Sequence, residues 1–316
     1  MKIQRIALVG GSGFVGRHLT RHLRNRGYLC RVVTRHAQRC RELRTVAEVV
    51  EANPNDPTQL AAALHGCEAV VYLAGILNQG GSTNSFQHVH VELVDKVLAA
   101  CQTARVGRLL HMSALNASHT NGGSDYLRSK GEGEDRALAM GRSGMAVTSF
   151  RPSVIFGPDD SFLNRFAALL RLPGPLPLAC PDARLAPVYV GDVVMAFANA
   201  LEDRSTFGLH YELCGPAEYS LEELVRLVAR YTAPGKRIIR LPDWASRLQA
   251  RVLQHVPGRP FTMDNYRSLQ TPSVCRQDGL AALGVTATSL ENAAPRLLAS
   301  GGRRARINHL RRASRR

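Results

Sequence analysis

A strand-like run followed by closely spaced glycines constrains the fold of this chain more than any other feature. Residues 3–9 lead directly into Gly10, Gly13 and Gly16, which are spaced three residues apart. Gly10 permits a tight turn out of a strand, Gly13 lets backbone N–H groups approach an anion, and Gly16 lets the next helix pack on a sheet. The pattern predicts a strand, a glycine-rich turn and a helix whose N-terminus binds the pyrophosphate of a dinucleotide.

The helix that follows the glycines has a clear apolar face. Val15, Leu19 and Leu23 recur every fourth residue, and Gly27 ends the pattern, as expected of an amphipathic helix. Phe14 and Val15 open this helix, so we include their backbone in the predicted cofactor site.

Strand-like runs alternate with helix-like segments through the first half of the chain. The clearest strands are 30–33, 69–73, 108–112 and 146–150, and the crossover helices are 58–64, 86–101 and 130–142. This alternation predicts an α/β fold with a Rossmann-type doubly wound parallel sheet.

A change to Pro-rich and Gly-rich stretches near residue 151 predicts two lobes. Residues 1–150 are expected to form an NAD(P)-binding Rossmann domain, joined by returning segments near 186–214. Residues 151–302 are expected to form mainly a smaller C-terminal lobe that binds a substrate or partner. In this lobe Ser220 and Glu223 predict a capping box at the start of a helix.

The basic charge is concentrated at one end of the chain. Of the net charge of +16, seven arginines lie in residues 303–316, which contain no acid, so the rest of the chain carries +9. A solvated, disordered basic tail and attraction to an anionic membrane surface both explain this segment. No aromatic platform for bases accompanies the charge, so we expect no nucleic-acid partner.

Two further features bear on location. No apolar run approaches the roughly 20 residues that span a bilayer, which predicts a cytoplasmic protein, either free or peripheral on the cytoplasmic face of the membrane. Within 243–254, Trp244, Leu248 and Val252 share one helical face. A helix lying on a membrane and a helix packed on its own lobe both fit this pattern.

The seven cysteines are odd in number and scattered, without metal-ligand spacing. They predict buried thiols in a reducing compartment and no metal site.

The end of the second strand bears on which dinucleotide binds. Residues 31–36 contain no carboxylate for the ribose 2′-hydroxyl of NAD, and Arg35 is placed to pair with a 2′-phosphate. This favours NADP(H) over NAD(H), although a solvated arginine would look the same. Asn53, in the turn after the third strand, is a candidate contact for the adenine edge.

Tyr126 and Lys130 lie four residues apart and therefore on one face of a helix. The Lys130 cation is expected to lower the pKa of Tyr126 from about 10, which would allow proton exchange with a substrate oxygen near neutrality. Lys130 would also hold the nicotinamide ribose. Ser113, at a strand end, would hydrogen-bond the same substrate oxygen, which makes these three residues the candidate catalytic set.

In this order, the motifs resemble the short-chain dehydrogenase/reductase superfamily in its extended, epimerase/dehydratase-like form. The resemblance covers residues 3–300 and rests on the glycine motif, residues 73–75, the Tyr126–Lys130 pair and residues 151–158. It implies that the cofactor also contacts Ala74, Gly75, Pro152, Ser153 and Ile155.

Residues 111–115, 126–132, 151–157 and 187–193 are more narrowly similar to a bacterial branch related to the nucleotide-binding accessory subunit of respiratory complex I. That branch implies structural holding of NADPH or a link to quinone metabolism. Ala114 stands where many superfamily enzymes carry a catalytic Ser or Thr, which implies that Ser113 would line the cofactor and that Ser118 would be the substitute. His90 stands near the register of an Asn that many members carry, either as a structural side chain or as a relay.

Two functions follow from these observations. The first is an NADP(H)-dependent oxidoreductase for an unknown small carbonyl or alcohol substrate. The alternative is a non-catalytic, NADPH-holding accessory or assembly factor of a respiratory complex.

Overall fold

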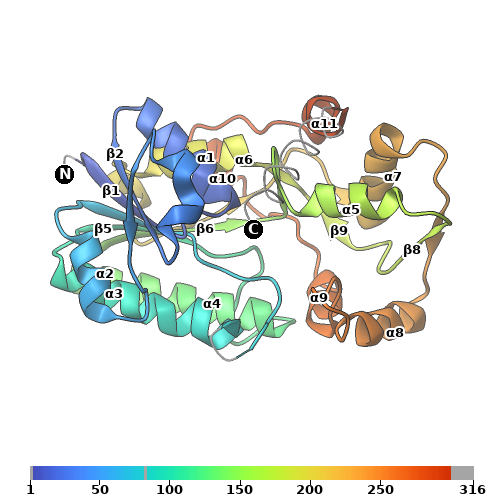
Figure 1. Cartoon of the computed structure of the whole chain (residues 1–316), viewed down its shortest axis with the longest axis horizontal. Coiled ribbons are helices and arrows are strands. Elements are labelled where there is room, and N and C mark those ends of the chain that lie inside the picture. The colour runs from blue at the N-terminus through green and yellow to red at the C-terminus, as the bar shows by residue number, and fades with distance from the viewer. Residues whose placement is uncertain (1–2, 82–83, 300–316) are drawn as a thin grey trace.

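A parallel sheet of seven strands forms the centre of the larger lobe (Figure 1). The computed structural model describes residues 3–81 and 84–299. The strand order is β11-β6-β5-β4-β1-β2-β3, which confirms the predicted Rossmann-type doubly wound sheet. The strands are β1 (Arg5–Val9), β2 (Leu29–Thr34), β3 (Glu48–Glu51), β4 (Ala69–Tyr72), β5 (Arg108–Met112), β6 (Ala146–Pro152) and β11 (His210–Leu213).

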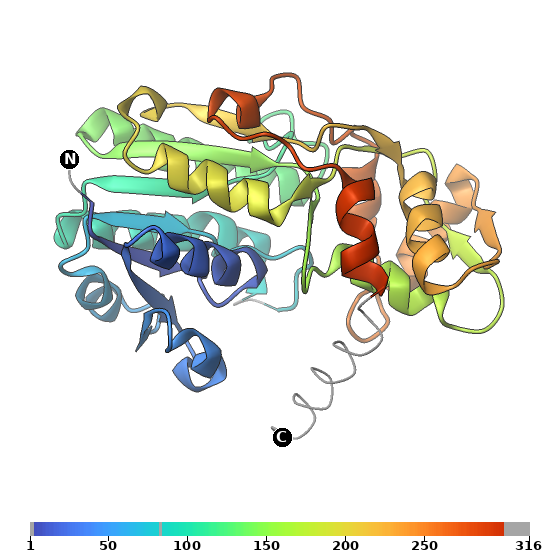
Figure 2. The same ribbon diagram turned by 90° about the horizontal axis from the view of Figure 1, so that it is seen from above.

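Helices cover both faces of this sheet (Figure 2). One face carries α1 (Phe14–Asn25), α6 (Val190–Ala200) and the short α10 (Gly279–Ala282), and the other carries α2 (Pro57–Leu64), α3 (Leu93–Thr103) and α4 (Asp125–Ala139). Ile6 and Leu8 belong to the core on the first face, and Ala7 and Val9 to the core on the second. Because both faces are buried, β1 is a continuous apolar run from Ile6 onward.

The smaller lobe surrounds a third apolar core between α5 (Phe162–Leu170), α7 (Leu221–Thr232) and α11 (Leu290–Ala299). The predicted capping box is present, since Ser220 and Glu223 bond each other's backbone N–H at the start of α7. Two further helices, α8 (Asp243–Leu253) and α9 (Met263–Leu269), lie side by side at the edge of this lobe (Figure 1). Three strand pairs complete it: β7 (Ile155–Phe156) with β10 (Val188–Tyr189), β8 (Leu176–Leu178) with β13 (Ile238–Arg240), and β9 (Arg184–Leu185) with β12 (Tyr219–Ser220).

The prediction of seven free thiols is corrected by a disulfide between Cys214 and Cys275. After α9, residues 270–278 return from the smaller lobe to the edge strand β11, where the Glu212 carboxylate accepts hydrogen bonds from the backbone of Arg276 and Gln277. This return places Cys275 beside Cys214. Because the two cysteines are 61 residues apart, the sequence gives no sign that they pair. The free cysteines are Cys30, Cys40, Cys67, Cys101 and Cys180.

Short helical turns occupy several connections. The segment expected as one helix over 86–101 begins with the π-helical turn η3 (Gln87–Glu92) before α3. The 3-10 turns are η1 (Ala37–Leu43), η4 (Met140–Ser143) and η5 (Arg204–Thr206). Within the described part of the chain, no helix has the length and apolar character needed to cross a membrane. The basic segment 303–316 lies outside the described residues.

Candidate active site

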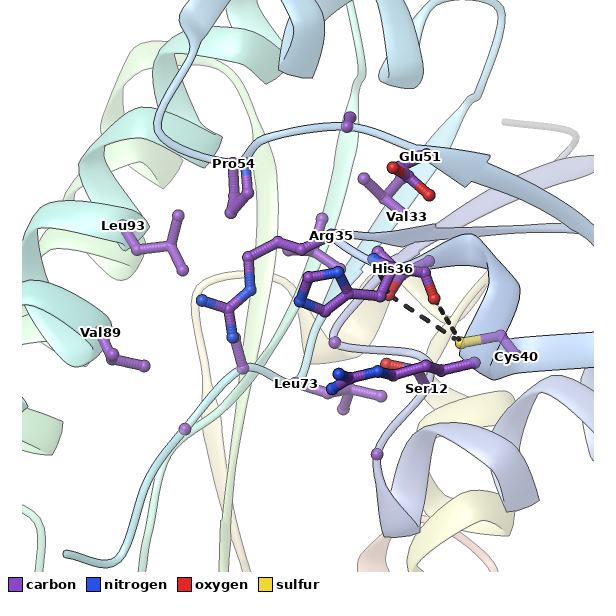
Figure 3. A pocket seen from close by; sticks show the side chains of 18 of the residues that line it. Ser12, Val33, Arg35, His36, Cys40, Glu51, Pro54, Leu73, Val89 and Leu93 are labelled. Carbon is purple, nitrogen blue, oxygen red and sulfur yellow. Dashed lines mark hydrogen bonds between the residues drawn. The ribbon is translucent and has the colours of Figure 1, made fainter. Parts of the chain in front are cut away.

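A cleft of about 1590 Å³ opens at the carboxyl ends of β1, β2 and β4, where parallel sheets of this kind bind ligands (Figure 3). Five of the predicted cofactor residues line it, namely Gly10, Gly13, Arg35, Ala74 and Gly75. The sheet order brings these residues together from three separate loops, which follow β1, β2 and β4.

The glycine turn fits a dinucleotide sterically. Gly10 has a φ of +86°, and a Cβ there would lie 2.8 Å from the backbone nitrogen of Ala74. A Cβ on Gly16 would lie 2.5 Å from the backbone of Gly11, so the helix can approach the turn only with glycine at this position. The backbone therefore makes a cradle that other side chains would fill.

The N-terminus of α1 supplies the attraction for an anion. Gly13 is the N-cap, so no side chain caps the helix, and the first turn contains no acid. The first backbone N–H groups, including those of Phe14 and Val15, lack intrahelical partners. Together with the helix dipole they favour a phosphate at this end.

The part of the cleft at the end of β2 is rich in arginine. Arg35 is exposed and reaches into the cleft (Figure 3). Arg17, Arg39 and Arg41 also line it, with Glu42, Glu51 and Asp159 as the acids. The Glu51 carboxylate accepts a hydrogen bond from the backbone N–H of Ala37 at 2.8 Å.

In the turn after β3, Pro54 and Asn55 line the cleft. The Asn53 side-chain oxygen is engaged with the Asn55 backbone N–H at 3.0 Å. A contact between Asn53 and adenine therefore stays a prediction.

Two of the three candidate catalytic residues, Lys130 and Ser113, lie at the end of β5. The Lys130 ammonium donates to the Met112 carbonyl at 2.7 Å. A Cβ on Gly75 would lie only 3.5 Å from Lys130 Nζ, so Lys130 lies next to a residue of the cleft wall, while Tyr126, Lys130 and Ser113 themselves do not line the cleft. Ser113 follows Met112, and its buried hydroxyl has no hydrogen-bond partner among the described residues. A buried, unpaired hydroxyl is costly, so Ser113 is available to donate to a ligand oxygen. Ser149 Oγ and both ring nitrogens of His111 are unpaired as well.

The structure corrects the expected pKa of Tyr126. Burial raises the pKa of Tyr126 to about 12, and the Asp264 carboxylate adds to the rise. Burial lowers the pKa of Lys130 to about 8, against an opposing effect of Glu134. Desolvation disfavours both charged forms, so in the absence of a ligand Tyr126 is a neutral phenol near neutral pH.

His90 is linked to Tyr126 through the Ser129 hydroxyl and by a direct contact between the rings. Its Nε2 accepts from the Ile76 backbone N–H at 3.1 Å, so its Nδ1–H donates to Ser129 Oγ at 2.9 Å. The Ser129 hydroxyl then donates to the Tyr126 carbonyl at 2.9 Å. The His90 ring also packs edge-on against the Tyr126 ring at 5.5 Å. Burial lowers the pKa of His90, which keeps the ring neutral.

Asp264, which the sequence did not reveal, touches the same helix from the other lobe. Its carboxylate accepts hydrogen bonds from the backbone N–H groups of Asp125 at 2.7 Å and Tyr126 at 3.2 Å. Asp264 lies in α9, whose start is set by a capping box between Thr262 and Asn265. The only sequence signal is that capping pattern, and it does not indicate which helix α9 meets.

Three residues that the family resemblance implies as cofactor contacts lie outside the large cleft. Pro152 ends β6, and Ile155 lies in β7. The Ser153 hydroxyl donates to the carbonyl of Ser273 at 2.8 Å, in the returning segment. None of the three lines the large cleft. Contact between these residues and a cofactor stays a prediction.

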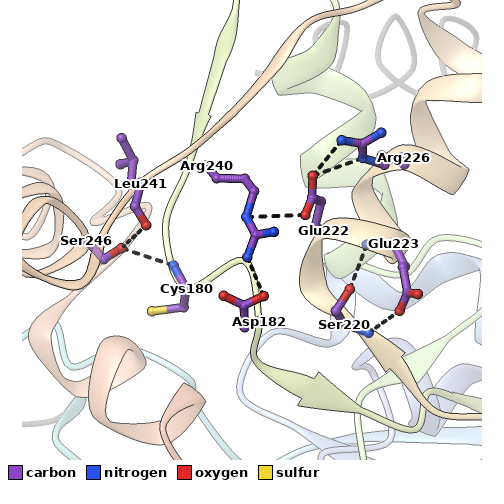
Figure 4. A network of polar contacts seen from close by, with 9 residues as sticks. All are labelled: Cys180, Asp182, Ser220, Glu222, Glu223, Arg226, Arg240, Leu241 and Ser246. Carbon is purple, nitrogen blue, oxygen red and sulfur yellow. Dashed lines mark hydrogen bonds and ion pairs between the residues drawn. The ribbon is translucent and has the colours of Figure 1, made fainter.

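A second cavity, of about 300 Å³, lies in the smaller lobe. It is lined by the loop at Cys180–Arg184, the start of α8 and the end of α9. Figure 4 shows Asp182 held by Arg240, which also pairs with Glu222 of α7. Within the described residues, no group of His, Cys, Asp and Glu side chains could hold a metal ion.

Comparison with known proteins agrees with this geometry. Residues 6–214 match the NAD dependent epimerase/dehydratase family. NADH dehydrogenase (ubiquinone) 1 alpha subcomplex subunit 9 of Rattus norvegicus mitochondria is 30% identical over 299 residues, covering 89% of this chain and 76% of its own. Ceramide reductase of Caulobacter vibrioides is 31% identical over 247 residues, covering 75% and 74%.

A solved structure shares the fold. UDP-glucose 4-epimerase from Thermus thermophilus, in complex with NAD, superimposes with a TM-score of 0.71 at 20% identity. The match covers 94% of this chain and 98% of that one.

Proposed function

The chain belongs to the NAD dependent epimerase/dehydratase family, and from this premise we propose that it is an NADP(H)-dependent oxidoreductase acting on a carbonyl or alcohol. The observation that carries the proposal is the unpaired, buried hydroxyl of Ser113 at the end of β5, next to the residue whose carbonyl binds Lys130. A protein that only stored a dinucleotide would use Lys130 to hold the ribose but would not need the Tyr126 phenol as a proton donor.

The chemistry of these side chains fits carbonyl reduction. When bound, the nicotinamide supplies a hydride to the carbonyl carbon. Tyr126, a neutral phenol with its pKa raised to about 12, donates its proton to the carbonyl oxygen, and the product is an alcohol. Ser113 donates a hydrogen bond to the same oxygen. The Lys130 ammonium stabilises the negative charge that Tyr126 acquires.

The preference for NADP(H) rests on the arginines of the cleft. Arg35 reaches into it, and three further arginines line it. Guanidinium groups pair strongly with phosphate, which supports a site for the 2′-phosphate of adenosine.

A second candidate function is that of a cofactor-holding accessory protein of a respiratory complex. It is favoured by the relative named as an NADH dehydrogenase subunit, which aligns with most of this chain. Bound NADPH would then serve stability alone, since a ligand at 100 times its dissociation constant adds about 2.7 kcal/mol. Together with this accessory role we propose a link to a quinone reaction. We also propose that residues 303–316 bind an anionic membrane surface.

Hydride transfer tests the proposal directly. The native protein is first analysed by mass spectrometry for bound nucleotide and lipid, and NADPH oxidation is then followed with apolar ketones and quinones. Tyr126→Phe should abolish turnover while leaving NADPH affinity nearly unchanged, and Lys130→Ala should weaken both. Tyr231→Phe, at an exposed tyrosine of the smaller lobe, is the matched control.

Turnover that survives Tyr126→Phe at an undiminished rate would remove the acid/base role. NADPH that binds tightly and is never oxidised by any substrate in the panel would favour the accessory function.

A further inference from the structure

The outer face of α8 exposes an apolar stripe, defined as Trp244, Leu248, Val252 and Val256. Their exposed fractions are 70%, 53%, 56% and 41%. The first three are spaced four residues apart in α8, and Val256 continues the spacing just beyond its end. A spacing of four places side chains on one face of a helix. The other large exposed apolar side chains of the described chain are spread over both lobes.

The opposite face of α8 is fixed to the smaller lobe, so the helix cannot turn to bury the stripe. Ser246 and Ala250 are buried there. The Ser246 hydroxyl accepts from the Cys180 backbone N–H at 3.2 Å and donates to the Leu241 carbonyl (Figure 4). On one flank, Arg247 Nε donates to the Tyr266 hydroxyl of α9 at 3.1 Å. The stripe is therefore exposed and does not pack against its own lobe.

The charges around the stripe are positive. Residues 243–259 contain Arg247, Arg251 and Arg259 and a single acid, Asp243. Arg247 and Arg251 follow the apolar positions by three residues along the helix, so they flank the stripe on one side. A tryptophan and aliphatic side chains beside arginines are typical of helices that lie in the surface of an anionic bilayer.

The size of the stripe suits insertion into a bilayer. Four side chains of at most about 250 Å² each, roughly half exposed, offer at most about 550 Å². A stable protein interface needs about 800 Å² from each partner, of which roughly 450 Å² is apolar, so the positive charges beside the stripe, and not its area, favour a bilayer. A bilayer requires no such minimum, because affinity grows with each apolar group inserted.

We propose that α8 inserts the apolar stripe into an anionic bilayer and so holds the smaller lobe on the membrane surface. Pro242, Asp243 and Ser246 at the start of α8 also line the second cavity, and Ser246 lies on the face of α8 opposite the stripe. The inference rests on the proposed membrane location and not on the proposed reduction.

Trp244 provides the measurement, because it is the only tryptophan in the chain. The full-length protein is mixed with vesicles of phosphatidylcholine containing phosphatidylglycerol, and with vesicles of phosphatidylcholine alone. With the anionic vesicles we expect a blue shift of Trp244 emission and quenching by lipids brominated in their acyl chains. With neutral vesicles we expect binding at least about tenfold weaker, because the positive charges gain no attraction.

The double variant Leu248→Asp, Val252→Asp keeps the tryptophan reporter and changes two exposed side chains, so folding should be preserved. Its Trp244 shift should need at least about tenfold more anionic lipid. Leu172→Asp, at an exposed leucine outside α8, is the matched control and should bind like the wild type.

Other outcomes would overturn the proposal. Co-sedimentation with vesicles while Trp244 emission stays unshifted would assign binding to the basic segment 303–316 alone. Equal lipid requirements for the wild type and the double variant would exclude insertion. A blue shift that appears without vesicles as protein concentration rises would identify the stripe as a contact between copies of the chain.

Discussion

At the scale of single residues, burial moves the two candidate catalytic groups in opposite directions. The pKa of Tyr126 rises to about 12 and that of Lys130 falls to about 8, because a low dielectric disfavours each charged form. The four-residue spacing indicated that the two groups share a helix face, but it carries no information on depth of burial or on Asp264. Their proximity could be predicted from the sequence, whereas their electrostatics could not.

The first prediction concerns Asp264, whose carboxylate binds the backbone N–H of Tyr126. Asp264→Asn removes a negative charge that disfavours the phenolate, so the pKa of Tyr126 should fall. Asparagine also caps helices, so the free energy of unfolding should change little. NMR titration of labelled tyrosine, with Tyr126→Phe to assign the signal, measures the pKa.

Asp125→Asn is the control for this experiment. The Asp125 carboxylate is partly exposed and already paired with Arg128, so the Tyr126 titration should not move. An unchanged Tyr126 pKa in Asp264→Asn would show that burial alone sets it.

The second prediction follows from the depressed pKa of Lys130. The folded value of about 8 lies below the ordinary 10.5, so between these pH values the unfolded chain binds more protons. This group therefore destabilises the fold below pH 8, and the penalty is relieved as pH rises towards 10.5. Lys130→Met should raise the free energy of unfolding at pH 7 and flatten its rise between pH 8 and 10. Urea unfolding of the cofactor-free protein at several pH values measures both, and parallel pH profiles for the two proteins would contradict the assignment.

The third prediction concerns the choice of cofactor. A charge-assisted pair between Arg35 and a 2′-phosphate is worth about 1.5 to 3 kcal/mol, or on the order of 10- to 150-fold in affinity. The wild type should bind NADPH more tightly than NADH, and Arg35→Asp should remove that difference. Calorimetry tests this, with Arg21→Asp on the exposed side of α1 as the control. Equal wild-type affinities would refute the role of Arg35.

At the scale of elements, local signals predicted most of the sheet and several helix starts. The strand expected at 108–112 is β5 as observed. The helix expected from 130 begins five residues earlier, at Asp125, where the Ser124 hydroxyl caps it by accepting from the Leu127 N–H. The π-helical turn before α3 has no such local signal. Caps and apolar spacing act within a few residues, so they define single elements and not the contacts between them.

The fourth prediction tests the packing of α1 on its turn. In Gly16→Ala the new Cβ would meet the Gly11 backbone at 2.5 Å, so α1 must shift. Overpacking of this kind costs about 1 to 3 kcal/mol, and it should also weaken NADPH binding at the helix N-terminus. Gly141→Ala, where a Cβ meets nothing within 4 Å, is the control and should be close to neutral. Thermal unfolding and calorimetry provide the two measurements, and a wild-type melting temperature in Gly16→Ala would contradict the steric argument.

At the scale of the whole molecule, contacts between residues far apart in the sequence form the disulfide and bring Asp264 to α4. Local sequence patterns do not predict such contacts. Residues 270–278 pass from α9 back to β11 and bring Cys275 to Cys214. The same part of the chain places Asp264 on the N-terminus of α4. These contacts depend on how the two lobes pack against each other. The spacing of residues within one segment carries no information on that packing. The division at residue 151 stays a prediction for the same reason, since α6 and β11 belong to the larger lobe although they follow it.

The last prediction concerns residues 303–316 and how the whole chain approaches a membrane. Each arginine near an anionic surface contributes up to about 1 kcal/mol, so seven set an upper bound near 7 kcal/mol. A basic segment without a lipid chain binds reversibly, and screening acts within about 8 Å at roughly 0.15 M salt. The full chain should therefore sediment with anionic vesicles at low salt and be released as salt rises. A chain ending at Gly302 should sediment less at low salt but keep the blue shift of Trp244, because α8 remains. Equal sedimentation of the two chains would leave residues 303–316 without a membrane role and assign the attraction to α8 alone.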